Sequence, residues 1–233
     1  MSRWILTIAL LAGSLALTEW LPFSPFFRNI DTMVHEFGHA AMTLLLSGQV
    51  QYIHLYENHS GVTMSAIEAG WRVIPVALAG YMTASLFAVL LFFFYRFGKY
   101  RTGLMLATGV AAASLILFVR NDFGAHWLLG FIGLNLLALA IPIGFVRKAY
   151  YLLIAFLTLV ESVTSALTIA FIAFVESDQA GDAANLAQAT GVPALLWGVL
   201  FTWFALWAAK RAIGYFLPGK PKPLPGKFFA RHI

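Results

Sequence analysis

Two histidines and a glutamate stand close together in an otherwise apolar stretch, MVHEFGHAAM at positions 33–42. In an α-helix, residues four apart lie on the same face, so the imidazoles of His35 and His39 can bind one metal ion. Glu36 lies beside them, where its carboxylate can reach a water molecule on that ion without binding the metal itself. This His-Glu-x-x-His arrangement is typical of zinc hydrolases, in which the ion activates water and the glutamate handles protons.

The surroundings of the motif favour a metal site over a structural role. The chain is 61% hydrophobic and only 11% charged. Two histidines could also hydrogen-bond between helices, but ionisable groups inside a membrane are costly and commonly functional. The motif therefore predicts zinc as the cofactor, with His35 and His39 as metal ligands and Glu36 as the catalytic residue.

The apolar runs of the sequence predict an all-α polytopic membrane protein. A soluble domain carries about a quarter charged residues, and several apolar runs here exceed the roughly 20 residues that a helix needs to cross a bilayer. We expect about seven transmembrane helices in an integral, multi-pass membrane protein. The expected spans are 4–21, 30–46, 71–95, 103–119, 126–146, 149–175 and 192–213.

Between the second and third spans, the sequence changes character. Residues 50–66 are rich in β-branched and aromatic side chains that partly alternate, with Asn58-His59-Ser60-Gly61 at the centre. This pattern predicts a short β-hairpin at the membrane edge. The chain otherwise forms a single domain over residues 1–215, followed by a basic tail rich in proline and glycine at 216–233. The absence of cysteine excludes disulfides and thiolate ligands.

A catalytic zinc ion usually has three protein ligands and one position for water. The candidates for the third ligand are Asp122, His126, Asp182 and Glu161. The second, fourth and sixth spans run in the same direction, so Asp122 and Asp182 lie at the membrane face nearest to His39, together with the hairpin. Glu161 lies deeper, near the level of His35. Each acid also has a structural alternative. Asp122 could pair with Arg120, Asp182 could cap a helix, and Glu161 could bond to another helix across the bundle.

Four stretches of the chain are, in chain order, HEFGHAAMTLLLSGQV, LAGYMTASLFAV, RNDFG and GDAANLAQATGVPALLWGVLF. They resemble the site-2 proteases, and most of all their small peptidase M50B-like branch. The resemblance implies an intramembrane zinc endopeptidase with His35 and His39 as ligands, Glu36 as general base and an acidic third ligand on a later span. Residues 121–124, Asn-Asp-Phe-Gly, are loosely similar to the loop that supplies that acid, so Asp122 is preferred over Asp182.

The expected partners are membrane lipid and a transmembrane peptide or protein substrate, with no nucleic acid. The alternative function is a non-hydrolytic metal-binding protein, either a transporter or a scaffold that retains the motif. A transporter should place polar ligands along a path through the bundle, whereas the polar residues here gather at one face. Lysine and arginine are concentrated at the opposite face, which predicts a cytosolic C-terminal tail. The resemblance to site-2 proteases implies the reverse orientation.

Overall fold

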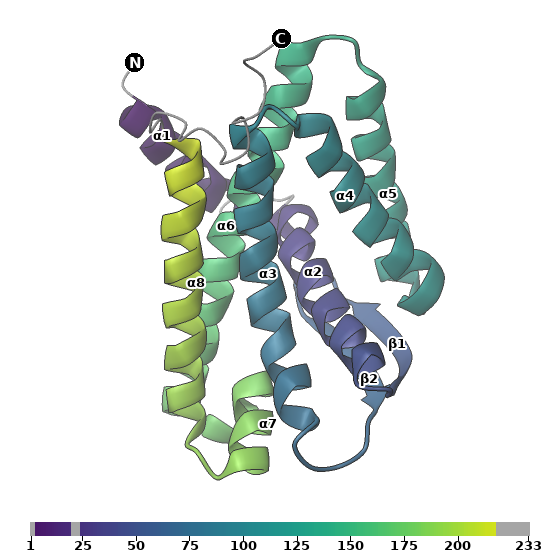
Figure 1. Cartoon of the computed structure of the whole chain (residues 1–233), viewed down its shortest axis with the longest axis vertical. Helices are drawn as coiled ribbons and strands as arrows, with labels where there is room; N and C mark the ends of the chain where they lie inside the picture. The colour runs from purple at the N-terminus through teal and green to yellow at the C-terminus, as the bar shows by residue number, and fades with distance from the viewer. Residues whose placement is uncertain (1–2, 20–23, 218–233) are drawn as a thin grey trace, which may run out of the picture.

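The computed structural model describes residues 3–19 and 24–217 and is mostly helical (Figure 1). The elements are α1 (Arg3–Glu19), α2 (Ser24–Leu45), β1 (Gln49–Leu55), β2 (Gly61–Ala66), α3 (Val73–Arg96), α4 (Tyr100–Ala113), α5 (Asp122–Ala140), α6 (Gly144–Val175), α7 (Gly181–Thr190) and α8 (Ala194–Phe216). A π-helical turn, Ser114–Phe118, extends α4, and a 3₁₀ turn, Ser177–Gln179, leads into α7. The expected tail lies, from residue 218 onward, outside the described residues.

The core of the bundle is formed where α3 packs against α2, α6 and α8 (Figure 1). Phe92 on α3, Phe156 on α6 and Phe216 on α8 meet edge to face, with ring centroids 4.9 to 6.1 Å apart. Aromatic pairs prefer this tilted geometry because the positive ring edge meets the negative ring face. The cluster holds these three helices in fixed relative positions above the hairpin end of the molecule.

The helix that carries the motif lies unusually close to α3. A Cβ atom added to Gly38 would lie 2.8 Å from the side chain of Thr83 and 2.9 Å from the backbone oxygen of Ala79. Only glycine fits at this crossing, and the neighbouring Ala40 is fully buried. Small residues allow such close approach of helices. The contact presses the histidine-bearing face of α2 against the start of α3.

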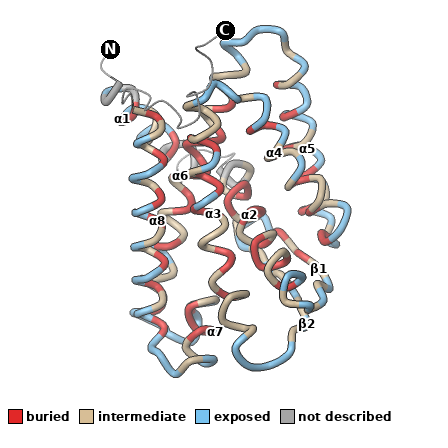
Figure 2. The backbone as a smooth tube through the Cα atoms, in the orientation of Figure 1, coloured by how far each residue is buried: buried red, intermediate tan, exposed pale blue. Residues whose placement is uncertain are grey.

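The fold class is confirmed, while the number of apolar spans differs from the expected seven. Among the described residues, four helices are long and apolar enough to cross a membrane: Val73–Arg96, Tyr100–Phe118, Asp122–Ala140 and Gly144–Val175. They carry exposed apolar residues such as Ile116 and Phe174, each 73% exposed. Figure 2 shows many exposed residues along the outer sides of these helices. The helix α2 falls short because it carries the polar motif, and α8 because it contains tryptophans and carries Lys210 and Arg211 before its end at Phe216.

Several helix boundaries differ from the expected spans for local reasons. The fifth expected span, 126–146, is interrupted, since α5 ends at Ala140 and α6 begins at Gly144. The break falls at Pro142: the preceding Ile141 has an extended backbone, with φ −61° and ψ 124°. A residue before proline avoids the helical conformation because the proline ring clashes with it.

The β-hairpin is confirmed at its expected position. The strands β1 and β2 pair in antiparallel fashion, and Ile53 and Leu55 of β1 are buried. The outer edge of β1 is occupied, because Val119 forms a parallel bridge with Ile53 and the Asn121 side chain bonds to both the nitrogen and the oxygen of Leu55. The sheet has two strands, so within the described part of the chain the outer edge of β2 has no strand partner.

Candidate metal centre

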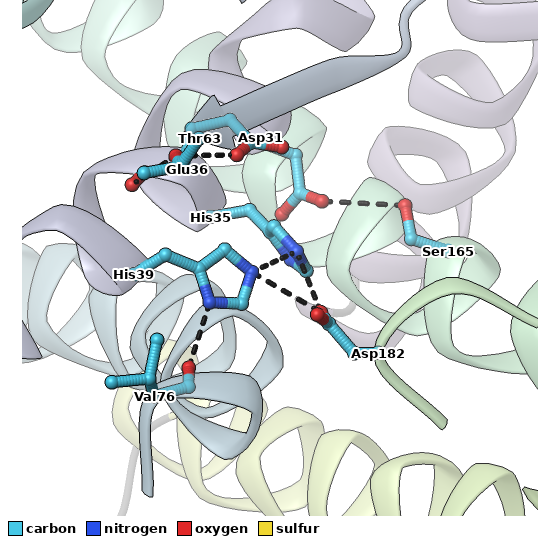
Figure 3. A network of polar contacts seen from close by, with 8 residues as sticks. All are labelled: Asp31, His35, Glu36, His39, Thr63, Val76, Ser165 and Asp182. Carbon is cyan, nitrogen blue, oxygen red and sulfur yellow. Dashed lines mark hydrogen bonds and ion pairs between the residues drawn. The ribbon is translucent and has the colours of Figure 1, made fainter. Parts of the chain in front are cut away.

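The two histidines of α2 point toward each other on one helix face (Figure 3). Their Nε2 atoms are 2.9 Å apart. The Nδ1 atom of His39 is 2.7 Å from the backbone oxygen of Val76 on α3. Since a carbonyl oxygen can only accept, Nδ1 is the donor in this contact, and Nε2 is the nitrogen that is directed at the cluster. A hydrogen bond of this kind orients a histidine for metal binding.

Asp182, at the start of α7, completes the cluster. Its Oδ2 atom is 3.2 Å from Nε2 of His35 and 3.1 Å from Nε2 of His39. The chain enters α7 through Gly181, whose φ of +48° suits glycine. Burial opposes the charged carboxylate, but the two imidazoles outweigh it and hold the pKa of Asp182 below its ordinary value. Asp182 is therefore an anion that faces two nitrogen donors.

These three donor atoms fit a metal ion. In a tetrahedral zinc site with bonds of 2.0–2.2 Å, ligand atoms lie roughly 3.3 Å apart, close to the observed 2.9 to 3.2 Å. Two imidazoles and a carboxylate are also a common ligand set for catalytic zinc. Within the described residues, His35, His39 and Asp182 form the group of acidic and imidazole side chains suited to hold an ion.

Glu36 lies next to this cluster but is not part of it. Its side chain is on the hairpin side of α2, where Thr63 of β2 approaches Oε2 to 2.6 Å (Figure 3). Gly61 of the same strand lies so close that an added Cβ would be 2.7 Å from both Cγ and Oε1 of Glu36. The hairpin therefore fixes the position of this carboxylate, which is 5% exposed.

On the side opposite the hairpin, α3 closes the cluster. A Cβ atom added to Gly80 would lie 2.5 Å from Nε2 of both His35 and His39. Because Gly80 has no side chain, the backbone of α3 at this position packs directly against both imidazoles. Tyr81 adds an edge-to-face contact with His35, with ring centroids 4.6 Å apart. The Nε2 atoms of both histidines thus lie against Gly80 of α3 and face Asp182 of α7.

The cluster opens into a large groove. A cavity of about 1080 Å³ is bounded by α2, the tip and second strand of the hairpin, the start of α3, α6 and α7. His35, Glu36, His39 and Asp182 all line it. A volume of this size accommodates several residues of a peptide as well as water.

The structure does not place Asp122, the residue preferred from the sequence, in this group. Asp122 is exposed in the first turn of α5, outside the group that meets the imidazoles, and its backbone oxygen is 2.7 Å from Nδ1 of the exposed His126. The residues just before Asp122, Val119 and Asn121, bind the outer edge of β1 instead. Glu161 is buried on α6 and pairs with Arg28, with Oε2 3.1 Å from Nε. Asp182, the second choice from the sequence, is the acid that faces the two imidazoles.

The sequence analysis missed four residues that shape this site. Thr63 and Gly61 act on Glu36, and Gly80 acts on the imidazoles, all across long stretches of chain that no local pattern connects. Asp31, in contrast, could have been found from a local pattern. It lies four residues before His35, and His35 lies four residues before His39. That spacing alone predicts that all three share one helix face.

Comparisons with known proteins give one match. No curated protein and no solved structure matches the chain. The sequence profile of the family described as Peptidase M50B-like matches residues 5–210. This range contains the motif helix, the hairpin, the four apolar helices and α7. The chain belongs to the Peptidase M50B-like family.

Proposed function

We propose that this membrane protein is a zinc-dependent endopeptidase that cleaves transmembrane or membrane-proximal peptides. The observation that supports this most directly is the convergence of His35 Nε2, His39 Nε2 and Asp182 Oδ2 at the wall of a large groove, with Glu36 beside them. A structural histidine pair would need neither the third donor nor the adjacent carboxylate. The assignment of Asp182 as third ligand is part of this proposal.

The proposed chemistry divides the work between the residues. His35, His39 and Asp182 would hold a zinc ion, which supplies a Lewis acid and lowers the pKa of water. Glu36 accepts a proton from the attacking water and passes it to the leaving amine. Thr63 donates a hydrogen bond to Glu36 and keeps the carboxylate oriented. Val76 and Gly80 keep the two imidazoles in place.

The open edge of β2 supports a mode of substrate binding. An unwound peptide could add to this edge as a third strand, held by main-chain hydrogen bonds. The edge borders the groove, since Gly61, Thr63 and Ser65 line it. A helix must be unwound before its peptide bonds can be attacked. We therefore propose that the substrate carries residues that weaken a transmembrane helix near the cleaved bond.

Lipid surrounds the exposed apolar helices in this proposal, and the groove opens near one membrane face. Excess lysine and arginine at the opposite end of the helices favours a cytosolic position for that end and for the C-terminal tail. Mapping the accessibility of single cysteines placed at Asn58 and Lys99 from either side of the membrane tests this orientation, because the parent chain has no cysteine.

The decisive experiment is a cleavage assay with purified protein in lipid nanodiscs. Membrane-embedded peptides that carry glycine, asparagine or proline at successive positions are incubated with the zinc-loaded protein, and products are identified by mass spectrometry. Wild type should cut, and both the metal-free protein and Glu36→Gln should not. Glu57→Gln, the same change at an exposed residue of the hairpin turn, is the matched control. A wild type that binds zinc but cuts no peptide would favour the transporter or scaffold.

A further inference from the structure

One buried carboxylate next to the metal centre is left out of the proposed chemistry. Asp31 on α2 is 4% exposed. Its Oδ2 atom accepts a weak hydrogen bond of 3.3 Å from the hydroxyl of Ser165 on α6, and its Oδ1 atom is buried without a hydrogen-bond partner among the described residues. A buried carboxylate oxygen without a donor is costly. A bound ligand with a hydrogen-bond donor would satisfy the Oδ1 atom.

Asp31 lies in the groove, one helical turn from His35. Four residues of helix correspond to a rise of about 6 Å, so the Asp31 carboxylate lies about that far along the groove from His35. Figure 3 shows it on the same side of α2 as His35, directed toward Ser165. Asp31, Arg28 and Ser165 line the same cavity as the metal centre. The groove thus extends from the proposed reaction centre to an end that holds a carboxylate.

This end of the groove has more acidic than basic side chains among the described residues. Arg28 bonds to Glu161 through Nε at 3.1 Å, which pairs one guanidinium with one carboxylate. Asp31 is a second acidic group, so among the described residues two carboxyl groups share this end of the groove with one guanidinium, and with both ionised the formal balance is −1. An occupant with a positive charge and N–H donors would satisfy both the charge and the Oδ1 atom. A lysine or arginine side chain has both properties.

We propose that this end of the groove, formed by Asp31 and Ser165, binds a lysine or arginine side chain of the substrate. The inference rests on the proposed peptidase function. An extended peptide advances about 3.3 Å per residue, so the basic residue would lie about two positions from the cleaved bond. A basic residue inside a membrane segment is costly by itself, and Asp31 would offer it a countercharge where the segment unwinds.

The test compares peptides that differ at one position only. Lysine, methionine or glutamate is placed at each of three positions on either side of the cleavage site, and kcat/KM is measured with zinc-loaded wild type. Lysine should exceed methionine by about ten-fold or more at one position, and glutamate should be cut least. This comparison needs no variant, so it cannot fail through misfolding. Equal rates for lysine and methionine at all six positions would overturn the inference.

Variants then assign the preference to Asp31. Asp31→Asn should lose the preference for lysine while it still cuts the methionine peptide, and Asp31→Lys should prefer glutamate. Asp178→Asn removes a carboxylate that is exposed before α7 and outside this groove, so it should keep the wild-type preference. A preference that persists in Asp31→Asn, with wild-type zinc content, would overturn the assignment.

Failure of this inference can be separated from failure of the peptidase proposal. If wild type cuts no peptide, the peptidase proposal fails, and equilibrium binding of the same fluorescent peptides to zinc-loaded Glu36→Gln still reports on the groove. Tighter binding of the lysine peptide that is lost in the Glu36→Gln, Asp31→Asn double variant would uphold a site for basic side chains. Equal binding of lysine and methionine peptides would reject it.

Discussion

The hydroxyl of Thr63 lies 2.6 Å from Oε2 of Glu36 and 3.0 Å from the backbone oxygen of the same residue. A hydroxyl has one proton to donate, and the shorter distance indicates that Thr63 donates it to the carboxylate of Glu36. A strand of the hairpin thereby holds the proposed general base by a charge-assisted hydrogen bond. A peptide that docks beside β2 would meet the reaction centre through this strand.

The first prediction concerns this hydrogen bond. Thr63→Ala should lower kcat by about 10-fold to 100-fold, because a hydrogen bond to a charged group contributes about 1.5–3 kcal/mol. Zinc content and KM should stay near the wild-type values. Thr63→Ser keeps the hydroxyl and should restore most of the rate. Steady-state cleavage of one membrane peptide by the three proteins measures this, and equal losses in the serine and alanine variants would contradict it.

The second prediction concerns Gly80. Gly80→Ala would place a Cβ atom 2.5 Å from Nε2 of both histidines, so the imidazoles must move by nearly 1 Å. Displacements of that size can cost about 100-fold in rate, and zinc affinity should fall as well. Competition with a chromogenic chelator measures the affinity. Gly109→Ala on α4 is the matched control, because its Cβ would meet nothing within 4 Å; equal affinities in the two variants would argue against the role given to Gly80.

The third prediction concerns the third ligand. Asp182→Ala should weaken zinc binding by more than about 100-fold, since loss of even an outer-shell partner costs 10-fold to 100-fold. Asp122→Ala should bind zinc like wild type, because Asp122 is exposed in the first turn of α5. Metal analysis of dialysed protein distinguishes the two. Loss of zinc in Asp122→Ala with retention in Asp182→Ala would restore the assignment first favoured by the sequence.

The sequence was sufficient for the parts of the site that depend on local geometry. His35, Glu36 and His39 are related by helix periodicity alone, and the structure brings the two imidazoles together. The hairpin at 50–66 was predictable because its side chains alternate and its turn residues stand at the centre. In both cases, the relevant distances lie within one element or between neighbours in the chain.

Local sequence patterns could not decide whether Asp122 or Asp182 lies next to the two imidazoles. Both residues lie in the first turn of a helix near the hairpin end of the bundle. What distinguishes them is that α7 packs against α3 and α8, which brings Asp182 to the imidazoles, whereas the start of α5 is engaged with β1 through Asn121. These are contacts between segments far apart in the chain, and local patterns in a single sequence do not contain them.

The last prediction concerns the open edge of β2. The backbone nitrogen of Tyr56 bonds to the oxygen of Ser60, and in an antiparallel pair the inward-bonding residues alternate. Gly61, Thr63 and Ser65 therefore direct their backbone N–H and C=O groups away from β1, toward the groove. Ser65→Pro removes one of these outward donors without removing a bond between β1 and β2.

If the substrate adds as a strand, Ser65→Pro should raise KM several-fold, because one main-chain hydrogen bond contributes about 0.5–1.5 kcal/mol. Its kcat and zinc content should change little, since Ser65 contacts neither Glu36 nor the metal ligands in any described hydrogen bond. Ser65→Ala keeps the backbone N–H and serves as the control for the loss of the hydroxyl. Cleavage kinetics over a range of peptide-to-lipid ratios give KM for each protein. An unchanged KM in the proline variant would mean that the substrate reaches the metal centre without pairing to this strand.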